Sequence, residues 1–198
     1  MNKNLKKNKT ISDIKRVVVV ETENFYICPY IEEDFKNLLQ LWRDHSTHSS
    51  DSHIEGVKRR ISRFIEAYKN TELGEFMVFS KSTNELIGRI TIKTDNRKSA
   101  CSEFYTLTDV DFDYIFFKKF QNRTDFAVEA SVAILDYAFK KINKKDRILS
   151  TYNPDKDSKG YKSVLEKIGF TDPKEIFVGE IKERLILYEL KREDFYST

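Results

Sequence analysis

The stretch FYTLTDVDFDYIFF at residues 104–117 constrains the fold more than any other part of the chain. Its apolar side chains recur at every second position, which is the period of a strand with one buried face. Phe112, Tyr114 and Phe116 share that face, and the aspartates at 109, 111 and 113 share the opposite one. After a short polar loop, SVAILDYAF continues with the apolar content of a buried helix. This strand, loop and helix predict a domain that mixes strands and helices.

The remaining elements alternate between the same two periods. The pattern predicts a first strand at 24–29, helices at 31–45 and 54–70, a hairpin at 75–93, and a helix at 125–143 after the long strand. Thr124 or Asp125 is the expected N-cap of that helix. A strand at 147–152, a helix at 158–170 ended by Gly169, and a second hairpin at 175–190 follow. No repeat or linker divides this order, which predicts one domain.

Composition and charge set the class of protein. At 198 residues with 39% hydrophobic content, the chain is long enough to bury a core and too apolar to be disordered. Residues 1–16 carry six basic side chains against one acid, a local charge of +5, which leaves −2 for the rest of a chain of total charge +3. We expect a flexible basic tail over 1–16 and a single domain over 17–198.

Several classes of site are disfavoured by the sequence. Cys28 and Cys101 stand far apart and give neither a disulfide framework nor a zinc cluster. No apolar run reaches the roughly 18 residues that a membrane span needs, and VVVV at 17–20 lacks the flanks of a signal peptide. We therefore expect a cytoplasmic protein without membrane contact. His45, His48 and His53 lie on a Ser-rich loop whose spacing fits no rigid metal geometry, so we expect no metal there.

Four segments, in this order, resemble one known family. They are ETENFYICPYIEEDF at 21–35, STNELIGRITI at 82–92, DFDYIFFKKFQNRTDFAVEASVAILDYAF at 111–139 and SVLEKIGF at 163–170. Together they resemble the GNAT acetyltransferases, particularly the ribosomal-protein N-acetyltransferase (RimJ/RimL-like) branch, over about residues 21–195. The resemblance implies a single-domain α/β fold of mixed α+β type. It has a mostly antiparallel central sheet with a splayed strand pair and about four flanking helices.

The resemblance also implies a mechanism. The pantetheine arm of acetyl-CoA adds to the splayed strand, at 114–117 here, like an extra strand. The diphosphate then lies over the following loop and helix N-terminus, where backbone N–H groups point outward. An amine attacks the acetyl carbonyl directly through a tetrahedral oxyanion, a carboxylate removes its proton, and a hydroxyl protonates the leaving thiolate.

The loop FQNRTDFAVEA at 120–130 departs from the family pattern Q-x-x-G-x-G/A, because it has no glycine. Either Gln121 takes the glutamine place with one extra loop residue, or Asn122 takes it and Asp125 stands where the internal glycine belongs. Without glycine the backbone approaches a diphosphate less closely, and Asp125 is a competing anion. We expect Asn122 to compensate in part through the left-handed conformation, and nearby positive charge to come from Lys118, Lys119 and Arg123. The loop is expected to bind CoA weakly.

Individual roles follow from the resemblance. Asp111 takes the place of the glutamate in the family's EIGY-like strand and is the expected general base. Ser158 and Tyr161 fall on the places of an asparagine and a serine ahead of the last helix, and either is a candidate to protonate the thiolate. With a longer loop, Asn153 is the equivalent asparagine instead. The predicted cofactor contacts are Tyr114, Ile115, Phe116, Phe117, Gln121, Asn122, Arg123, Thr124, Asp125, Phe126, Ala127 and Asn153.

Three functions remain open at this point. The first is acetyl-CoA-dependent N-acetylation of a primary amine, on a protein N-terminus, a polyamine or a small molecule, with the acidic strand favouring a cationic acceptor. The second is a degenerate GNAT-fold binding protein, marked by the loop without glycine. Nucleic-acid binding through the basic tail ranks last, because the aromatic residues form no basic stacking surface. The apolar segment RLILYEL at 184–190 suits either a homodimer edge or the core.

Overall fold

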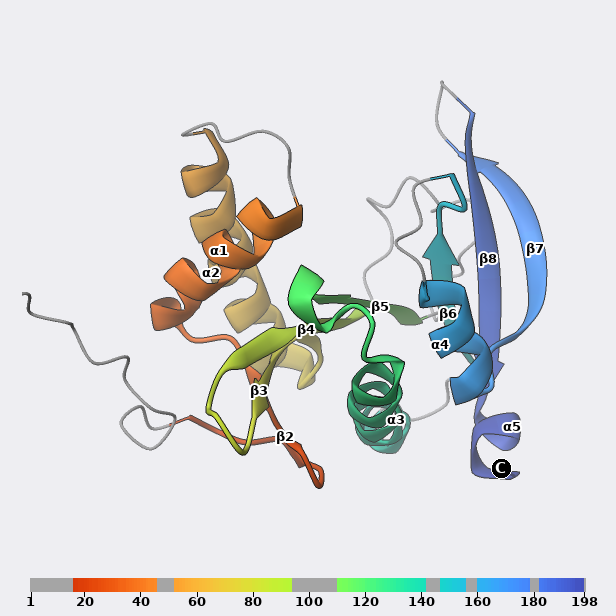
Figure 1. Cartoon of the computed structure of the whole chain (residues 1–198), viewed down its shortest axis with the longest axis horizontal. Coiled ribbons are helices and arrows are strands. Elements are labelled where there is room, and N and C mark those ends of the chain that lie inside the picture. Colours follow the sequence, from red (N-terminus) through yellow and green to blue (C-terminus); the bar gives the residue numbers. More distant parts are fainter. Residues whose placement is uncertain are drawn as a thin grey trace, which may run out of the picture.

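One mixed sheet of eight strands runs through the molecule, in the order β1-β2-β3-β4-β5-β6-β8-β7 (Figure 1). The computed structural model describes residues 16–45, 52–93, 110–141, 147–155, 160–178 and 182–197. The strands are β1 (Val20–Glu21), β2 (Phe25–Pro29), β3 (Gly74–Ser80), β4 (Leu86–Lys93), β5 (Val110–Phe116), β6 (Arg147–Tyr152), β7 (Thr171–Val178) and β8 (Glu183–Lys191). The helices are α1 (Phe35–His45), α2 (Ser52–Thr71), α3 (Thr124–Lys141), α4 (Tyr161–Ile168) and α5 (Arg192–Ser197), with 3-10 turns at Glu32–Asp34 and Lys118–Phe120.

The predicted fold class is confirmed. All neighbouring strands pair antiparallel except β5 and β6, which pair parallel. Every predicted element is present in the predicted order, and β1 and α5 are additions. The predicted part of the long strand at 104–109 lies outside the described residues. β7 begins at Thr171, earlier than predicted, with a register shift between Thr171 and Lys174 that accommodates Pro173.

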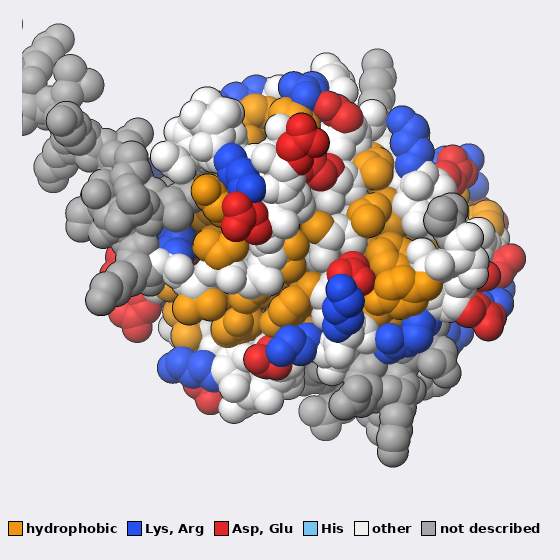
Figure 2. Space-filling view, turned by 90° about the horizontal axis from the view of Figure 1, so that it is seen from below, with side chains coloured by type: hydrophobic (Ala, Val, Ile, Leu, Met, Phe, Trp, Pro, Cys, Tyr) orange, Lys and Arg blue, Asp and Glu red, His pale blue; other side chains and the backbone are white. Residues whose placement is uncertain are grey.

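The surface does not present one sign of charge over a wide area on the face seen from below. Figure 2 shows Lys and Arg side chains interspersed there with Asp and Glu, around a band of hydrophobic side chains. A nucleic-acid surface concentrates basic residues instead. Within the described residues, no helix is both long and apolar enough to cross a membrane.

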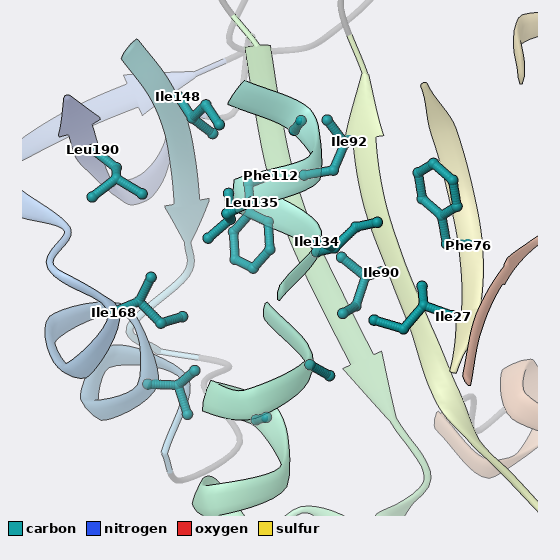
Figure 3. Packing of buried hydrophobic residues seen from close by; sticks show 14 of the residues in the cluster. Ile27, Phe76, Ile90, Ile92, Phe112, Ile134, Leu135, Ile148, Ile168 and Leu190 are labelled. Carbon is teal, nitrogen blue, oxygen red and sulfur yellow. The ribbon is translucent and has the colours of Figure 1, made fainter. Parts of the chain in front are cut away.

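Two apolar clusters cover opposite faces of the sheet. Alternation along β3 places Phe76 and Val78 in the cluster with α3 and α4, and Met77 and Phe79 in the cluster with α1 and α2. Figure 3 shows Ile134 of α3 among the sheet residues Ile90, Ile92 and Phe112 of the first cluster. The helices therefore pack against the sheet from both sides, with α3 and α4 on one face and α1 and α2 on the other.

The end of the predicted tail is anchored. The guanidinium of Arg16 donates to both carboxylate oxygens of the fully buried Asp34 and lies 4.7 Å from the ring centre of Phe79. Asp34 also accepts a hydrogen bond from the backbone N–H of Ile31 at 3.0 Å, which caps the turn before α1. Residues 1–15 of the predicted tail lie outside the described residues.

Candidate active site

The two central parallel strands separate after a short contact. Among the described residues, β5 and β6 pair only at Val110 with Ile148 and at Asp111 with Leu149, although both strands continue beyond these residues. A cleft of about 290 Å³ lies where they diverge, and we call it the β5–β6 cleft. It is lined by His45, Asp113, Tyr114, Ile115, Phe116, Phe120, Gln121, Ala127, Thr151, Tyr152, Asn153, Gly160 and Tyr161.

The backbone of β5 presents polar groups to this cleft. The N–H of Phe117 donates to the carbonyl of Ile87, a residue of β4, at 3.0 Å. From this bond the two strands stay in register, with Arg89 opposite Ile115 and Ile90 opposite Tyr114. Because such bonds alternate along an antiparallel pair, the N–H and C=O groups of Tyr114 and Phe116 point away from β4, toward β6. A strand exposed in this way can pair with an extended amide-containing ligand.

The C-terminal end of α1 is tied to the same strand. The Nε2–H of His45 donates to the carbonyl of Phe116 at 2.8 Å, since a carbonyl can only accept. The carboxylate of Asp44 accepts the backbone N–H of Lys118 at 2.6 Å, at the start of the loop after β5. These two contacts fix the position of α1 relative to the strand and the loop.

The loop between β5 and α3 forms without glycine. Residues 118–120 make one 3-10 turn, in which the N–H of Phe120 donates to the carbonyl of Phe117 at 2.8 Å. The N–H of Arg123 then donates to the carbonyl of Phe120 at 2.9 Å. Asn122 has no positive φ, so the expectation that it adopts the left-handed conformation is wrong. The 3-10 turn reverses the chain with ordinary dihedral angles, which any residue adopts.

The anion at the start of α3 is already paired with a cation. Nη2 of Arg123 donates to the carboxylate of Asp125 at 2.6 Å, and the guanidinium lies 3.6 Å from the ring centre of Phe126. The hydrogen bond that Asp125 accepts from Arg123 lowers the pKa of Asp125, and the nearby backbone amide of Phe126 lowers it further. Asp125 therefore stays ionised and paired with Arg123 in the first turn of α3.

Asp113 and Tyr161 meet inside the β5–β6 cleft. The hydroxyl of Tyr161 lies 3.5 Å from a carboxylate oxygen of Asp113 and 2.9 Å from Oγ of the buried Ser150. The ring of Tyr161 stacks on that of Tyr114, with ring centres 4.8 Å apart. Burial and the nearby Asp113 carboxylate raise the pKa of Tyr161 well above its usual value. The hydroxyl therefore stays protonated at neutral pH.

A row of alternating charges leads from α2 to Asp113. Nε of Arg60 lies 3.1 Å from both carboxylate oxygens of Glu75, and Nη1 of Arg89 lies 3.1 Å from one of them. Nη2 of Arg89 lies 3.4 Å from Asp113. Burial alone would raise the pKa of the fully buried Glu75, but Arg89 and Arg60 outweigh it and lower that pKa. Glu75 is therefore a fixed anion that orients both guanidinium groups.

The protonation of Asp113 follows from its position. Although 40% of its side-chain surface is accessible, it lies in a recess surrounded by protein atoms. Desolvation raises the pKa of Asp113, Arg89 acts in the opposite direction, and the carboxylates of Asp111 and Glu75 raise it further. A carboxylate with a raised pKa holds a proton more firmly, which suits a general base.

A second cleft adjoins the first on the α1–α2 face of the sheet. We call it the α2 cleft, and its volume is about 250 Å³. It is lined by Arg60, Phe64, Glu75, Thr91, Lys93, Asp111, Phe112, Asp113 and Thr151. Asp113 and Thr151 line both clefts, so the two meet at the carboxylate that faces Tyr161.

The sequence comparison identifies the family to which this site belongs. A family model described as the acetyltransferase (GNAT) domain matches residues 24–171, which is more than half of the chain. The chain belongs to the GNAT acetyltransferase family. This match confirms the family membership that the sequence resemblance indicated. Comparison with curated protein sequences gives no match.

Several solved structures have the same fold. The GNAT-family acetyltransferase from Bacillus anthracis is 19% identical with a TM-score of 0.61, over 88% of this chain and 98% of that one. The ribosomal-protein-S5-alanine acetyltransferase from Vibrio fischeri is 20% identical with a TM-score of 0.65, over 88% and 97%. A spermidine N-acetyltransferase chimera from Vibrio cholerae and hSSAT is 13% identical with a TM-score of 0.63, over 88% and 99%. At these identities the likeness concerns the fold.

The GNAT structure brings seven of the fifteen predicted site residues together in the β5–β6 cleft. Of the predicted set, Tyr114, Ile115, Phe116, Gln121, Ala127, Asn153 and Tyr161 line the β5–β6 cleft. Phe117 is buried at the end of β5, and 122–126 form the loop and the first turn of α3. Asp111 lines the α2 cleft, where its carboxylate lies 3.0 Å from Nζ of Lys93. Ser158 lies outside the described residues.

Other residues of this GNAT site are not predicted by the sequence. No role is assigned to Asp113 from the sequence. The feature that could have pointed to it is its position two residues after Asp111, on the same acidic face of the strand. Glu75 and Arg89 give no signal, because their pairing arises only when β3, β4 and α2 assemble. Of the predicted histidine loop, His48 lies outside the described residues. Within those residues, no group of His, Cys, Asp or Glu is arranged to hold a metal ion.

The pairing of Asp125 leads to a prediction about the loop. In Asp125→Gly, the anion disappears and Arg123 loses its carboxylate partner. We expect the Kd for acetyl-CoA, measured by calorimetry, to fall about threefold to tenfold, as for a helix-terminal charge change of roughly 1 kcal/mol. Asp125→Asn is the matched control, since it removes the charge and keeps the side chain. Equal or weaker binding by both variants would show that Asp125 does not oppose the cofactor.

Proposed function

We propose that this GNAT protein uses acetyl-CoA to acetylate a primary amine by direct transfer at the junction of its two clefts. The observation that carries this proposal is the position of Asp113, which lines both clefts and lies 3.5 Å from the hydroxyl of Tyr161. A carboxylate and a hydroxyl that meet at one place in the cleft can supply the base and the acid that acyl transfer to an amine requires.

The residues around the β5–β6 cleft fit acetyl-CoA. The backbone of Tyr114 and Phe116 faces the cleft and suits the two amide groups of a pantetheine arm. The loop and the N-terminus of α3 lie next along the chain and suit the diphosphate, with Lys118 and Lys119 nearby. Acetyl-CoA supplies the acetyl group as an activated thioester when it is bound there.

Two side chains handle the protons. Asp113 accepts a proton from the amine that enters through the α2 cleft, and its raised pKa strengthens it as a base. Tyr161 donates its proton to the departing sulfur, and Ser150 and Asp113 hold that hydroxyl in place. The products are the N-acetylated amine and free CoA, so one proton leaves the amine and one reaches the thiolate.

Related structures do not select among amines. One GNAT neighbour is named for a ribosomal-protein alanine and another for spermidine, which are different classes of amine. Both classes contain a primary amine, and that shared group is the acceptor that we propose.

Calorimetric titration of acetyl-CoA into the full chain, followed by release of free CoA on addition of mixed amines, tests this function. Micromolar binding with amine-dependent CoA release supports it. Binding without release for any amine would indicate a binding protein that keeps the GNAT fold. Absence of binding in both the wild type and Asp125→Gly would exclude an acetyl-CoA-dependent role.

Tyr161→Phe tests the proton donor. The variant keeps the ring that stacks on Tyr114 and loses only the hydroxyl, so we expect acetyl-CoA affinity to stay within about twofold. We expect kcat to fall about 10- to 100-fold, because loss of one positioned acid typically costs at least that much. Steady-state kinetics at neutral pH measures both. Tyr152→Phe is a matched control on the same cleft, and a similar loss of kcat in that variant would argue against a specific role for Tyr161.

A further inference from the structure

Asp113 belongs to a row of polar side chains that crosses three neighbouring strands. Glu75 of β3 lies opposite Thr91 of β4, and Thr91 lies opposite Asp113 of β5. Arg89 precedes Thr91 by two residues on β4, so its side chain leaves the same face of the sheet. Because adjacent strands lie about 4.8 Å apart, the long side chain of Arg89 reaches both carboxylates of this row.

The two carboxylate oxygens of Asp113 have different partners. Oδ2 lies 3.4 Å from Nη2 of Arg89, and Oδ1 lies 3.5 Å from the hydroxyl of Tyr161. The last side-chain torsion of an aspartate has a broad energy profile, so the strand alone does not fix which way the oxygens point. With Oδ2 directed at the guanidinium, Oδ1 faces Tyr161 in the β5–β6 cleft. Contact with Arg89 therefore selects one orientation of the carboxylate.

Arg89 is itself held from the other side. Its Nη1 donates to the carboxylate of Glu75 at 3.1 Å and to the hydroxyl of Thr91, and both acceptors are buried. Nε of Arg89 is buried and makes no hydrogen bond within the part of the chain that the structure describes. The two carboxylates thus set the orientation of this side chain, with one donor left unsatisfied. Because a guanidinium is rigid and planar, fixing Nη1 at Glu75 also fixes Nη2 at Asp113.

Arg89 has the strongest effect of the charges that surround Asp113. The other charged or titratable groups around it are Asp111 on β5, Glu75 on β3, Lys93 on β4, Arg60 on α2 and Tyr161 on α4. Desolvation raises the pKa of Asp113, Arg89 lowers it, and Lys93 lowers it by less than Arg89. Lys93 lies 3.0 Å from Asp111, which is its own carboxylate partner. Arg89 is therefore the cation on which the state of Asp113 depends most.

We propose that Arg89 is a positioning residue for acetyl transfer: held by Glu75, it keeps one oxygen of Asp113 directed at Tyr161 and the incoming amine. This assignment rests on the proposed function, in which Asp113 is the general base. Among the described residues that line the two clefts, Arg89 is absent, so it acts through Asp113 and not by touching the cofactor or the amine.

Two variants should move the pKa of Asp113 in opposite directions. Arg89→Gln removes an attractive charge, so the pKa should rise by about one unit or more. Glu75→Gln removes a repulsive charge and leaves Arg89 with Asp113 as its carboxylate partner, so the pKa should fall. Carbon-13 NMR of the side-chain carboxyl groups measures this pKa in the full chain without acetyl-CoA. The signal of Asp113 is assigned by its absence in Asp113→Asn.

Arg60→Gln is the matched control for these titrations. Like Arg89→Gln, it takes one guanidinium away from the buried Glu75, but the carboxylate that Arg60 contacts is Glu75 and not Asp113. It should change the pKa of Asp113 much less than Arg89→Gln does. An equal change in both variants would mean that the loss of a partner of Glu75, and not the contact with Asp113, is the cause.

Kinetics tests the positioning role itself. In Arg89→Gln, kcat should fall about 10- to 100-fold, because misplacement of a catalytic group by about 1 Å costs up to that much. The Kd for acetyl-CoA should stay within about threefold, since Arg89 lies outside the lining of the β5–β6 cleft. Arg89→Lys keeps the charge without the planar fork, so its kcat should lie between those of Arg89→Gln and the wild type.

Each outcome decides the proposal. Opposite shifts of the pKa, together with a lower kcat at unchanged Kd, support it. Shifts in the same direction, no shift, or a wild-type kcat in Arg89→Gln would overturn it. If Arg89→Gln does not fold, Arg89→Lys decides, since a wild-type kcat in that variant would overturn the need for the fork and a lower one supports it. Failure of the wild type to bind acetyl-CoA would overturn the proposed function and this role with it, whereas the NMR titrations would still report the contact.

Discussion

In Asp113→Asn, kcat for any accepted amine should fall about 100- to 1000-fold, because loss of a positioned general base typically costs this much. Asparagine keeps the size of the side chain and an oxygen that can accept from Arg89, which lies 3.4 Å away in the wild type. It cannot take a proton from the amine. We expect acetyl-CoA affinity to stay within about threefold, since the exchange leaves the backbone of β5 in place. Single-turnover kinetics with calorimetry separates the two quantities.

The dependence of wild-type kcat/KM on pH should also show that Asp113 acts as the base. Asp113 acts as a base only when ionised, and its pKa lies above the usual carboxyl range near 4 because of desolvation and the neighbouring acids. As pH falls through that raised pKa, kcat/KM should decrease, and this acidic limb should vanish in Asp113→Asn. Tyr161 adds no limb near neutral pH, because its pKa lies well above its usual value.

Stability separates this result from simple unfolding. A carboxyl whose pKa is higher in the folded than in the unfolded state stabilises the fold below the unfolded pKa, and the contribution is lost as pH rises through the folded pKa. Above that folded pKa the ionised Asp113 therefore gives no stability, and Asp113→Asn should unfold at an equal or higher temperature. A slow but fully folded variant supports a catalytic role.

Asp111→Asn is the decisive comparison, because the family resemblance assigns the base to Asp111 and the geometry favours Asp113. Asp111 lies beside Lys93 in the α2 cleft and does not line the β5–β6 cleft. We expect its substitution to change kcat by less than about tenfold. If Asp111→Asn is the slower variant and Asp113→Asn retains its rate, the sequence-based assignment is right.

The order of elements could be predicted because period and turn chemistry agree over long segments. The two hairpins, the helix at 124–141 and the stop at Gly169, whose φ is 104°, all follow from local pattern. The early start of β7 could not be predicted in this way, because Pro173 reads as a strand breaker. In the folded protein, Pro173 fits in β7 because the pairing with β8 shifts register between Thr171 and Lys174.

The cofactor loop shows where family patterns mislead. Because the family glycine is missing, Asn122 is expected to take its place in the left-handed conformation. Instead, a 3-10 turn at 118–120 connects β5 to α3, and Asn122 has no positive φ. The buried Glu75 shows a different limit of sequence reasoning. A charged residue near the start of a strand gives no sign of burial, because its two guanidinium partners come from α2 and β4.

Gly88→Ala should be the most destabilising single-methyl change at the site. Gly88 of β4 pairs with Phe116 of β5, and a Cβ atom there would lie 2.2 Å from the carbonyl oxygen of Ile115 and 2.6 Å from Cα of Phe116. Those are backbone atoms of the strand that faces the cleft, so β5 itself must move. Overpacking against backbone should cost about 3 kcal/mol or more, which lowers Tm by roughly 6–12 °C in a domain of this size.

The same shift should abolish acetyl-CoA binding before the protein unfolds, because the backbone of Tyr114 and Phe116 loses its position relative to α3. Gly56→Ala is the control: Gly56 lies within α2, and a Cβ there meets nothing within 4 Å. Alanine in a helix interior is favoured over glycine by about 0.5–1 kcal/mol, so this variant should keep or raise Tm and bind acetyl-CoA normally. Thermal unfolding and calorimetry on the two variants give opposite results if contact with β5 is the cause. A Gly88→Ala protein that keeps both wild-type Tm and affinity would mean that β4 and β5 are not packed as closely as this structure has them.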